Sequence, residues 1–229
     1  MHSGGKMQAV ILALLRPVCS LVTVCCQRQK AACFLLTFVC SMSILSLSSC
    51  SKPLGWDYFP LSNGAQADYS VEFAAPFVGV QKGKARERVD GRENIRGSDY
   101  YKVVSVTTGI PGAESQTNYF RKTEKGIYEI EGKHKDSPEF LAFPFPLVVG
   151  SEWTVSEAEG KYECRVESEE SAEMWGKTYE HALKMTCHGQ YKGKAIEMSE
   201  YLAKGVGAVK IVSRYSGVTI EFTLEGYKH

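Results

Sequence analysis

The chain has 229 residues, 44% of them hydrophobic, and a formal net charge of +1. Four of its 27 basic residues and none of its 26 acidic residues lie in positions 1–49, so the rest of the chain carries a net charge of −3. This balance offers no basic surface for nucleic acid, and we expect no nucleic-acid partner. Positions 50–229 are long enough for one domain with one hydrophobic core.

Positions 1–49 are typical of a signal or leader segment. The run from 31 to 47 is apolar or small, and Arg28 and Lys30 precede it. A basic region followed by a short apolar region predicts a secretory signal, and about 17 apolar residues are marginal for spanning a bilayer core of roughly 30 Å. The alternative is an uncleaved signal anchor. A second apolar stretch, at 8–24, suggests that the natural start lies further downstream.

The end of this leader resembles the lipobox of bacterial lipoproteins. Leu47, Ser48 and Ser49 stand at the three positions before Cys50. The resemblance implies cleavage before Cys50 and a diacylglyceryl group on its thiol, which would anchor the chain to a membrane. It therefore implies an extracytoplasmic protein of a bacterial cell envelope. In a Gram-negative host, Ser51 after the cysteine implies the outer membrane, facing the periplasm.

The rest of the chain predicts a short lipidated tether at 50–64 and one β domain at 65–229. Apolar residues alternate with polar ones in the first and last strands of this domain, at 69–77 and 218–225. This period of two is typical of half-buried strands. Further strands are predicted at about 86–94, 99–108, 116–122, 127–132, 151–156, 161–170, 178–188, 195–203 and 207–214.

Short connections between these eleven segments predict an all-β antiparallel meander. Turn residues separate the segments at 96–98, 124–126, 175–177 and 216–217. A sheet of this size curls or closes, so we expect a curved half-barrel or barrel, with a two-sheet β-sandwich as the alternative.

Four longer sequence patterns occur after the leader segment: WDYFPL at 56–61, PLVVGSEW at 146–153, GKTYEHALK at 176–184 and EYLAKGVGAVK at 200–210. Together they resemble bacterial exported domains of uncharacterised function with a half-barrel like that of lipoprotein carriers. The resemblance spans most of residues 56–225. It implies an envelope protein and supplies no catalytic residue.

Cys164 and Cys187 are the two cysteines after position 50. A hairpin folded about Trp175 and Gly176 would place them opposite each other on neighbouring antiparallel strands, within disulfide reach. A half-residue shift of the turn would make them diagonal neighbours instead. We therefore treat the pair as a disulfide candidate in an exported domain.

No motif of catalysis or metal binding is found. His188 and Cys187 are adjacent on a predicted strand and point to opposite faces, so both cannot easily bind one metal ion. No HExxH, GxSxG, SxxK or glycine-rich phosphate loop occurs, and we expect no catalytic residue, metal or cofactor. The acidic run at 163–173 is interpreted as a solvated strand face, in which Glu163, Glu167 and Glu169 point the same way.

The segment 140–149 is strongly apolar and contains two prolines. Proline cannot donate to a sheet ladder, so this segment belongs on a sheet edge or across a barrel opening. It either plugs the barrel or forms a wall of an apolar pocket. The pocket hypothesis names four residues: Phe77, Tyr119, Phe143 and Phe145.

The sequence favours a lipid-anchored envelope protein with a non-catalytic binding or structural role, such as binding an apolar ligand or lipid in the curved sheet. The alternative is a module that docks an envelope protein through a sheet face or edge, and the third possibility is a hydrolase. A carrier requires a continuous apolar cavity of several hundred Å³, as roughly expected for ligand pockets.

Overall fold

The computed structural model describes residues 52–229, except 111, 114, 133–134 and 158–159. The described residues form one short 3-10 helix, η2 (Trp56–Tyr58), and twelve strands. The strands are β1 (Gln66–Ala75), β2 (Gly79–Ile95), β3 (Ser98–Thr108), β4 (Gln116–Thr123), β5 (Gly126–Glu131), β6 (Phe140–Pro144), β7 (Glu152–Ser156), β8 (Gly160–Met174), β9 (Lys177–Tyr191), β10 (Lys194–Ala203), β11 (Gly207–Tyr215) and β12 (Val218–Lys228).

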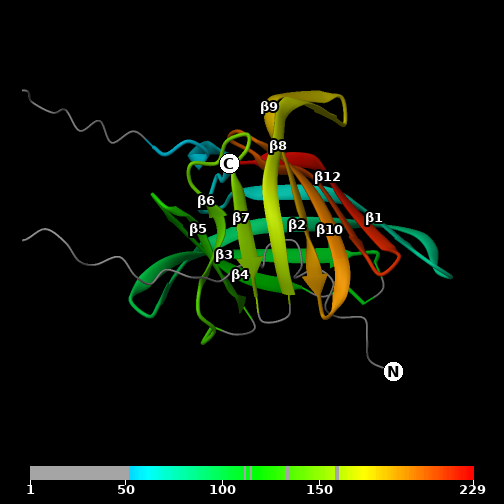
Figure 1. Ribbon diagram of the computed structural model, residues 1–229, viewed down its shortest axis with the longest axis horizontal. Helices are drawn as coiled ribbons and strands as arrows, with labels where there is room; N and C mark the ends of the chain where they lie inside the picture. Colours follow the sequence, from blue (N-terminus) through cyan, green and yellow to red (C-terminus); the bar gives the residue numbers. More distant parts are fainter. Residues whose placement is uncertain (1–51, 111, 114, 133–134, 158–159) are drawn as a thin grey trace, which may run out of the picture. The chain divides into compact units, whose positions relative to one another are not determined.

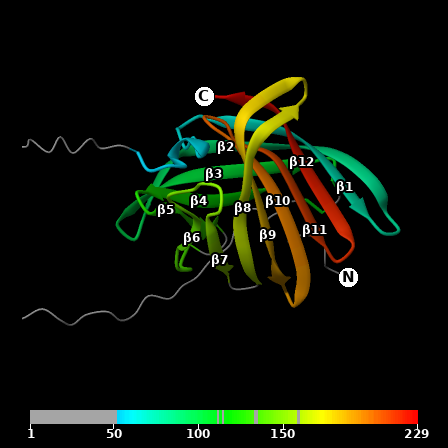
Figure 2. The same ribbon diagram turned by 45° about the horizontal axis from the view of Figure 1, so that its top comes forward.

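All twelve strands belong to one antiparallel sheet in the order β6-β5-β4-β3-β2-β1-β12-β11-β10-β9-β8-β7. Every strand pairs with its neighbour in sequence except β6 with β7, while β1 pairs with β12. The sheet curls into a nearly closed barrel (Figures 1 and 2). The prediction of an all-β meander that forms a barrel is confirmed, and the two-sheet sandwich is not the arrangement adopted.

Tight turns with glycine explain the long meander. At Arg96–Gly97, Trp175–Gly176 and Ser216–Gly217, both turn residues have positive φ, between 51° and 80°. Such turns match the twist of the two flanking strands, and glycine takes a positive φ at little cost. The predicted turn positions are therefore the observed hairpin turns.

The open seam of the barrel lies between β6 and β7. Among the described residues no ladder joins these strands, but Phe143 of β6 and Trp153 of β7 lie side by side with ring centroids 6.3 Å apart. The segment 140–149 was predicted on a sheet edge or across the barrel opening, and β6 is the edge strand at one side of the seam. Pro144 is tolerated since β6 is an edge strand with one ladder only.

The segment before β1 packs against the domain. We call residues 53–64 the N-terminal strap. Tyr58 is buried, and its hydroxyl donates a hydrogen bond to the carbonyl of His181. The ammonium of Lys122 donates to the carbonyls of Trp56 and Phe59 at 2.7 and 2.6 Å. The part of the predicted tether from Trp56 onward is thus attached to β4 and β9.

The barrel interior is mostly filled with side chains. One cluster joins the strap to strands β2–β10, and a second joins β1, β2, β11 and β12. A third, small cluster comprises Ile95, Tyr100, Tyr119 and Ile130. Apolar side chains alternate with polar ones along the strands, and successive side chains point to opposite faces of the sheet. The inward positions therefore form the core, and the outward positions are mainly polar.

Candidate functional site

The larger of two cavities on the inner side of the curved sheet has a volume of about 130 Å³ and lies where the strap crosses the strands. Its wall is mostly apolar and combines the strap, β1, β2, β4, β5, β6, β10, β11 and β12. The lining residues include Tyr58, Ala67, Tyr69, Glu87, Glu200 and Tyr227. The volume falls short of the several hundred Å³ expected for a carrier of whole lipids.

Glu87 brings a carboxyl group to the β2 side of this cavity. It occupies an inward position between Ala85 and Val89, both buried. The Ser105 hydroxyl on β3 donates a hydrogen bond to its Oε1 at 3.1 Å. Burial raises the pKa of Glu87, and the hydrogen bond from Ser105 opposes that change in part.

Glu200 brings a second carboxyl group from β10. It lies between the buried residues Met198 and Leu202, and it also lines a smaller cavity of about 30 Å³ beside Trp153. Burial raises the pKa of Glu200 to about 8, and the nearby charge of Glu87 adds to the effect. The two carboxyls therefore belong to different walls of one space and disfavour each other's ionisation.

Glu129 on β5 is a third inward carboxyl group. The side chain is fully buried, and neither oxygen has a hydrogen-bond partner. It shares a strand face with Ile127, which lines the larger cavity, and lies opposite Phe120, which lines it too. Burial, and then the neighbouring acids Glu131, Glu157 and Glu87, raise its pKa well above the usual range. Burial therefore favours the protonated form of this carboxyl group.

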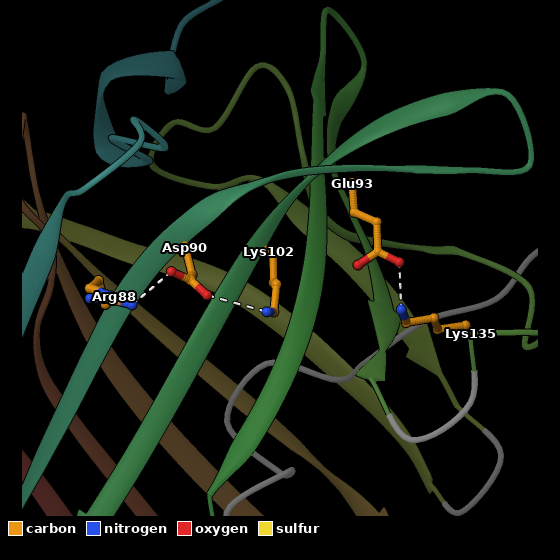
Figure 3. Close-up of polar contacts among 5 residues, drawn as sticks. All are labelled: Arg88, Asp90, Glu93, Lys102 and Lys135. Atoms are coloured by element: carbon orange, nitrogen blue, oxygen red, sulfur yellow. Dashed lines mark hydrogen bonds and ion pairs between the residues drawn. The ribbon is translucent and has the colours of Figure 1, made fainter.

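The cationic residue on the cavity lining, Arg88, is held on the outer face. Arg88 touches the cavity, but its guanidinium is paired with Asp90 at 2.7 Å, and Asp90 also accepts from Lys102 at 3.2 Å (Figure 3). The figure shows a second outer ion pair, between Glu93 and Lys135. Alternation places Arg88 and Asp90 outside while Glu87 faces inside. The inward acids are thus left without a cationic partner among the described residues.

The structure assigns the four predicted pocket residues to different places. Phe143 lines both cavities. Phe145 packs on the core beside Trp56 and Phe59. The predictions for Phe77 and Tyr119 need correction. Phe77 lies in the β1–β2 turn, with a φ of 66° and a fully exposed ring, because β1 ends at Ala75.

Tyr119 is buried in the small cluster with Ile95, Tyr100 and Ile130 and does not line either cavity. Its neighbour Phe120 lines the larger cavity instead. Adjacent strand residues point to opposite faces, so a core that covers both faces of β4 buries both rings. Burial alone therefore does not identify the face that bears the cavity.

The structure contains a disulfide between Cys164 and Cys187, with their Cα atoms 4.0 Å apart. The β8–β9 hairpin turns at Trp175 and Gly176, as predicted, but it holds two bulges. One adds a residue to β9 near His181, and the other adds a residue to β8 between Val166 and Ser168. The two register shifts cancel, which leaves the cysteines directly opposite each other.

The acidic run on β8 is a solvated face, since Glu163, Glu167 and Glu169 are all exposed. His181 pairs with Glu169, with 2.6 Å between Nδ1 and Oε1. Within residues 52–229, apart from the gaps, no group of three His, Cys, Asp or Glu side chains could hold a metal ion. In that same part of the chain no helix is long and apolar enough to cross a membrane.

Glu87, Glu129 and Glu200 were not predicted from the sequence, although the alternation of apolar residues indicates each of them. Each lies two positions from an apolar residue on the same strand face, as in the order Met198, Glu200, Leu202. A glutamate in phase with the apolar face of a strand predicts a buried carboxyl group. The leader residues Leu47, Ser48, Ser49 and Cys50 lie outside the described residues.

Comparisons with known proteins give two structural similarities. No protein-family model matches the chain, and no curated protein matches it significantly. A Bacteroides fragilis protein described as exported, with a YmcC-like fold, has a TM-score of 0.48. A Parabacteroides distasonis protein described as a lipoprotein has a TM-score of 0.43. Each is 13% identical and covers 75% of this chain and 98% of its own. At these scores neither similarity supports an inference about function.

Proposed function

We propose that this protein is a lipid-anchored, extracytoplasmic protein of the bacterial envelope that binds a small, largely apolar ligand inside its barrel, without catalysis. The observation that carries the binding role is the cavity of about 130 Å³ walled by the strap and both halves of the sheet. Engineered cavities of similar size, roughly 150 Å³, stay dry and bind benzene. The size restricts the ligand to a small molecule or one end of a larger one.

The anchoring part of the proposal rests on Cys50 and its lipobox. Tyr58, on the cavity wall, follows Cys50 by eight positions. A fully extended chain of that length spans at most roughly 29 Å. A diacylglyceryl group on Cys50 would therefore keep the cavity near the bilayer surface, facing the periplasm in a Gram-negative host.

Replacement of Cys50 tests the anchor. We expect Cys50→Ala to move the protein from the membrane fraction to the soluble extracytoplasmic fraction, because two acyl chains are needed for stable attachment. The matched control is Cys40→Ala, a cysteine upstream of the lipobox, which should leave the fractionation unchanged. Because an uncleaved leader also holds a variant at the membrane, incorporation of labelled glycerol is measured alongside, and a wild-type protein without label at Cys50 would disprove lipid anchoring at this residue.

Filling the cavity tests the binding role. Ala67 lies on the wall between Glu87 and Tyr227, its partners on β2 and β12. Toluene at millimolar concentration should raise the Tm of the wild-type domain and shift the NMR signals of Val89, Leu202 and Ile211. Ala67→Phe should abolish both effects, while the exposed Ala195→Phe should keep them. Ala67→Val provides a smaller change if the phenylalanine variant does not fold.

A toluene effect that is the same in the wild type and in Ala67→Phe would place binding elsewhere and refute the cavity role.

We propose a non-catalytic role because of the size of the cavity. Paired carboxylates can hydrolyse a glycosidic bond, but the cavity is too small for the two sugar rings that flank such a bond. Incubation with envelope polysaccharide should therefore release no reducing sugar.

A second role, docking of an envelope protein, is favoured by the β1–β2 hairpin tip. Phe77 is fully exposed, and Val78 and Val80 are more than half exposed. An apolar tip of this kind is typical of a contact site rather than of a solvated turn. Crosslinking from position 77 in intact cells should capture an envelope protein, and Phe77→Ser should remove that product, if docking is the function.

A further inference from the structure

We propose that the barrel cavity selects an organic ammonium ion, with the apolar part of the ligand against the cavity wall and its ammonium group between Glu87 and Glu200. This proposal rests on the proposed function, since it names the ligand class for the same cavity. It adds charge selectivity to a site that size and shape alone would leave open to any small apolar molecule.

The first support is the position of the two acids. Glu87 on β2 and Glu200 on β10 line the same cavity, although β1, β12 and β11 separate them in the sheet. The strands between them curve, so that the two carboxyls approach one interior space from different walls. Carboxylate oxygens that face one space from two sides can both accept from a group with several N–H donors, such as an ammonium ion.

The second support is that no cation among the described lining residues is paired with either acid. Arg88 is held outside by Asp90, as described above. Tyr58 and Tyr69 donate their hydroxyl protons to the carbonyls of His181 and Ala208. Glu200 therefore has no cation or strong donor directed at it, and Glu87 has only the hydroxyl of Ser105.

The third support comes from a buried polar group without a partner. The Tyr227 hydroxyl is buried on the cavity wall and makes no hydrogen bond. Buried groups that lack partners are costly, and a polar ligand group is one way to satisfy them.

Ammonium binding is coupled to the loss of a proton from Glu200. Burial and the charge of Glu87 hold the pKa of Glu200 near 8, so this carboxyl is mainly protonated at pH 7. The titratable or charged groups around it are Glu87, Arg88, Tyr58, Tyr69, Tyr227 and, further along the interior, Glu129. Binding of an ammonium ion at pH 7 would ionise Glu200 and release its proton to solvent. Ammonium affinity should therefore rise between pH 6 and pH 8.

Three probes of similar shape test the inference: benzylammonium, benzyl alcohol and benzoate. Their affinities are measured on the intact domain by calorimetry in two buffers of different ionisation enthalpy. Benzylammonium should bind at least about tenfold more tightly than benzyl alcohol, because its ammonium group forms charge-assisted hydrogen bonds in a buried site. Its binding should also release the proton of Glu200 to the buffer. Benzoate should bind most weakly, because its carboxylate offers no N–H donor to Glu87 or Glu200.

Matched variants locate the effect. Glu200→Gln and Glu87→Gln should each weaken benzylammonium by about tenfold or more and change benzyl alcohol by less than about twofold. The control is Glu197→Gln, an exposed glutamate on the same strand, β10, which should change neither affinity. Thermal unfolding of each variant confirms that it is folded.

The outcomes separate this inference from the proposed function. Equal binding of benzylammonium and benzyl alcohol, or tighter binding of benzoate, overturns the ammonium selectivity and leaves the cavity role intact. Benzylammonium binding that survives both glutamine substitutions also overturns it, since the cation would then lie elsewhere. No binding of any probe, toluene included, overturns both.

Discussion

The glutamates of β8 and those of the barrel interior are the same residue type in opposite environments. Glu163 and Glu167 lie on the exposed face of β8, whereas Glu129 is fully buried and Glu200 is partly buried. The difference arises from strand phase: a shift of one position turns a side chain from solvent to core. An acidic run in the sequence therefore marks a solvated face, while isolated acids in phase with apolar residues mark the candidate site.

The largest expected effect comes from placing a full charge at the buried position. Glu129→Lys should reduce the free energy of unfolding by about 3–5 kcal/mol, because the ammonium would lie in the core without a partner. Urea unfolding measures the change, with Glu129→Met as the control that keeps the volume and removes the polar group. The methionine variant should be at least as stable as the wild type. An equally stable lysine variant would show that Glu129 reaches solvent.

Removal of the disulfide perturbs the inner face of β8, since Cys164 is buried on the face opposite the exposed acids. Replacing both Cys164 and Cys187 with alanine should lower the free energy of unfolding by about 3 kcal/mol, since the bridge restricts the unfolded chain. Alkylation of the native exported protein, followed by mass spectrometry, should find no free thiol at these positions. Two alkylated cysteines in the native protein would contradict the bridge.

Glu200 should give a pH-dependent effect of intermediate size. Its folded-state pKa of about 8 lies above the ordinary value of 4.5, so the folded state holds a proton that the unfolded state has lost between these pH values. The stability of the wild type should therefore fall as pH rises from 4.5 to 8. Glu200→Gln should remove this loss, so that it stabilises the domain by a few kcal/mol at pH 8 and has little effect at pH 4.5.

A gain from Glu200→Gln that is equal at both pH values would assign the stabilisation to packing rather than to ionisation. The exposed Glu197→Gln on the same strand is the matched control and should show no pH-dependent gain.

The smallest effect is expected on the outer face. Glu163→Lys should leave the Tm unchanged, because the side chain is exposed and its charge is solvated. Thermal unfolding at moderate salt measures the Tm of Glu163→Lys, and Glu129→Lys is measured under the same conditions for comparison. A loss of stability comparable with that of the buried variant would mean that the outer face of β8 packs against something in solution.

Part of the fold follows from local patterns in the sequence. Alternation and glycine turns predict the barrel, and the hairpin centre at Trp175 and Gly176 predicts the cysteine pair. Other parts do not follow. The two bulges in β8–β9 cancel only when both are formed, and Phe77 and Phe143 have the same residue type but opposite exposure.

The sequence by itself determined the strand periodicity, the turn positions and the residue pattern at Cys50, because these depend on neighbouring residues. Only the tertiary structure decided which strands close the barrel, that the N-terminal strap forms a cavity wall, and that Glu87 and Glu200 share one space. These features depend on the curvature of a twelve-stranded sheet, which brings residues more than a hundred positions apart to the same interior. Local sequence patterns specify the face of each side chain, and the curl of the sheet specifies its neighbours.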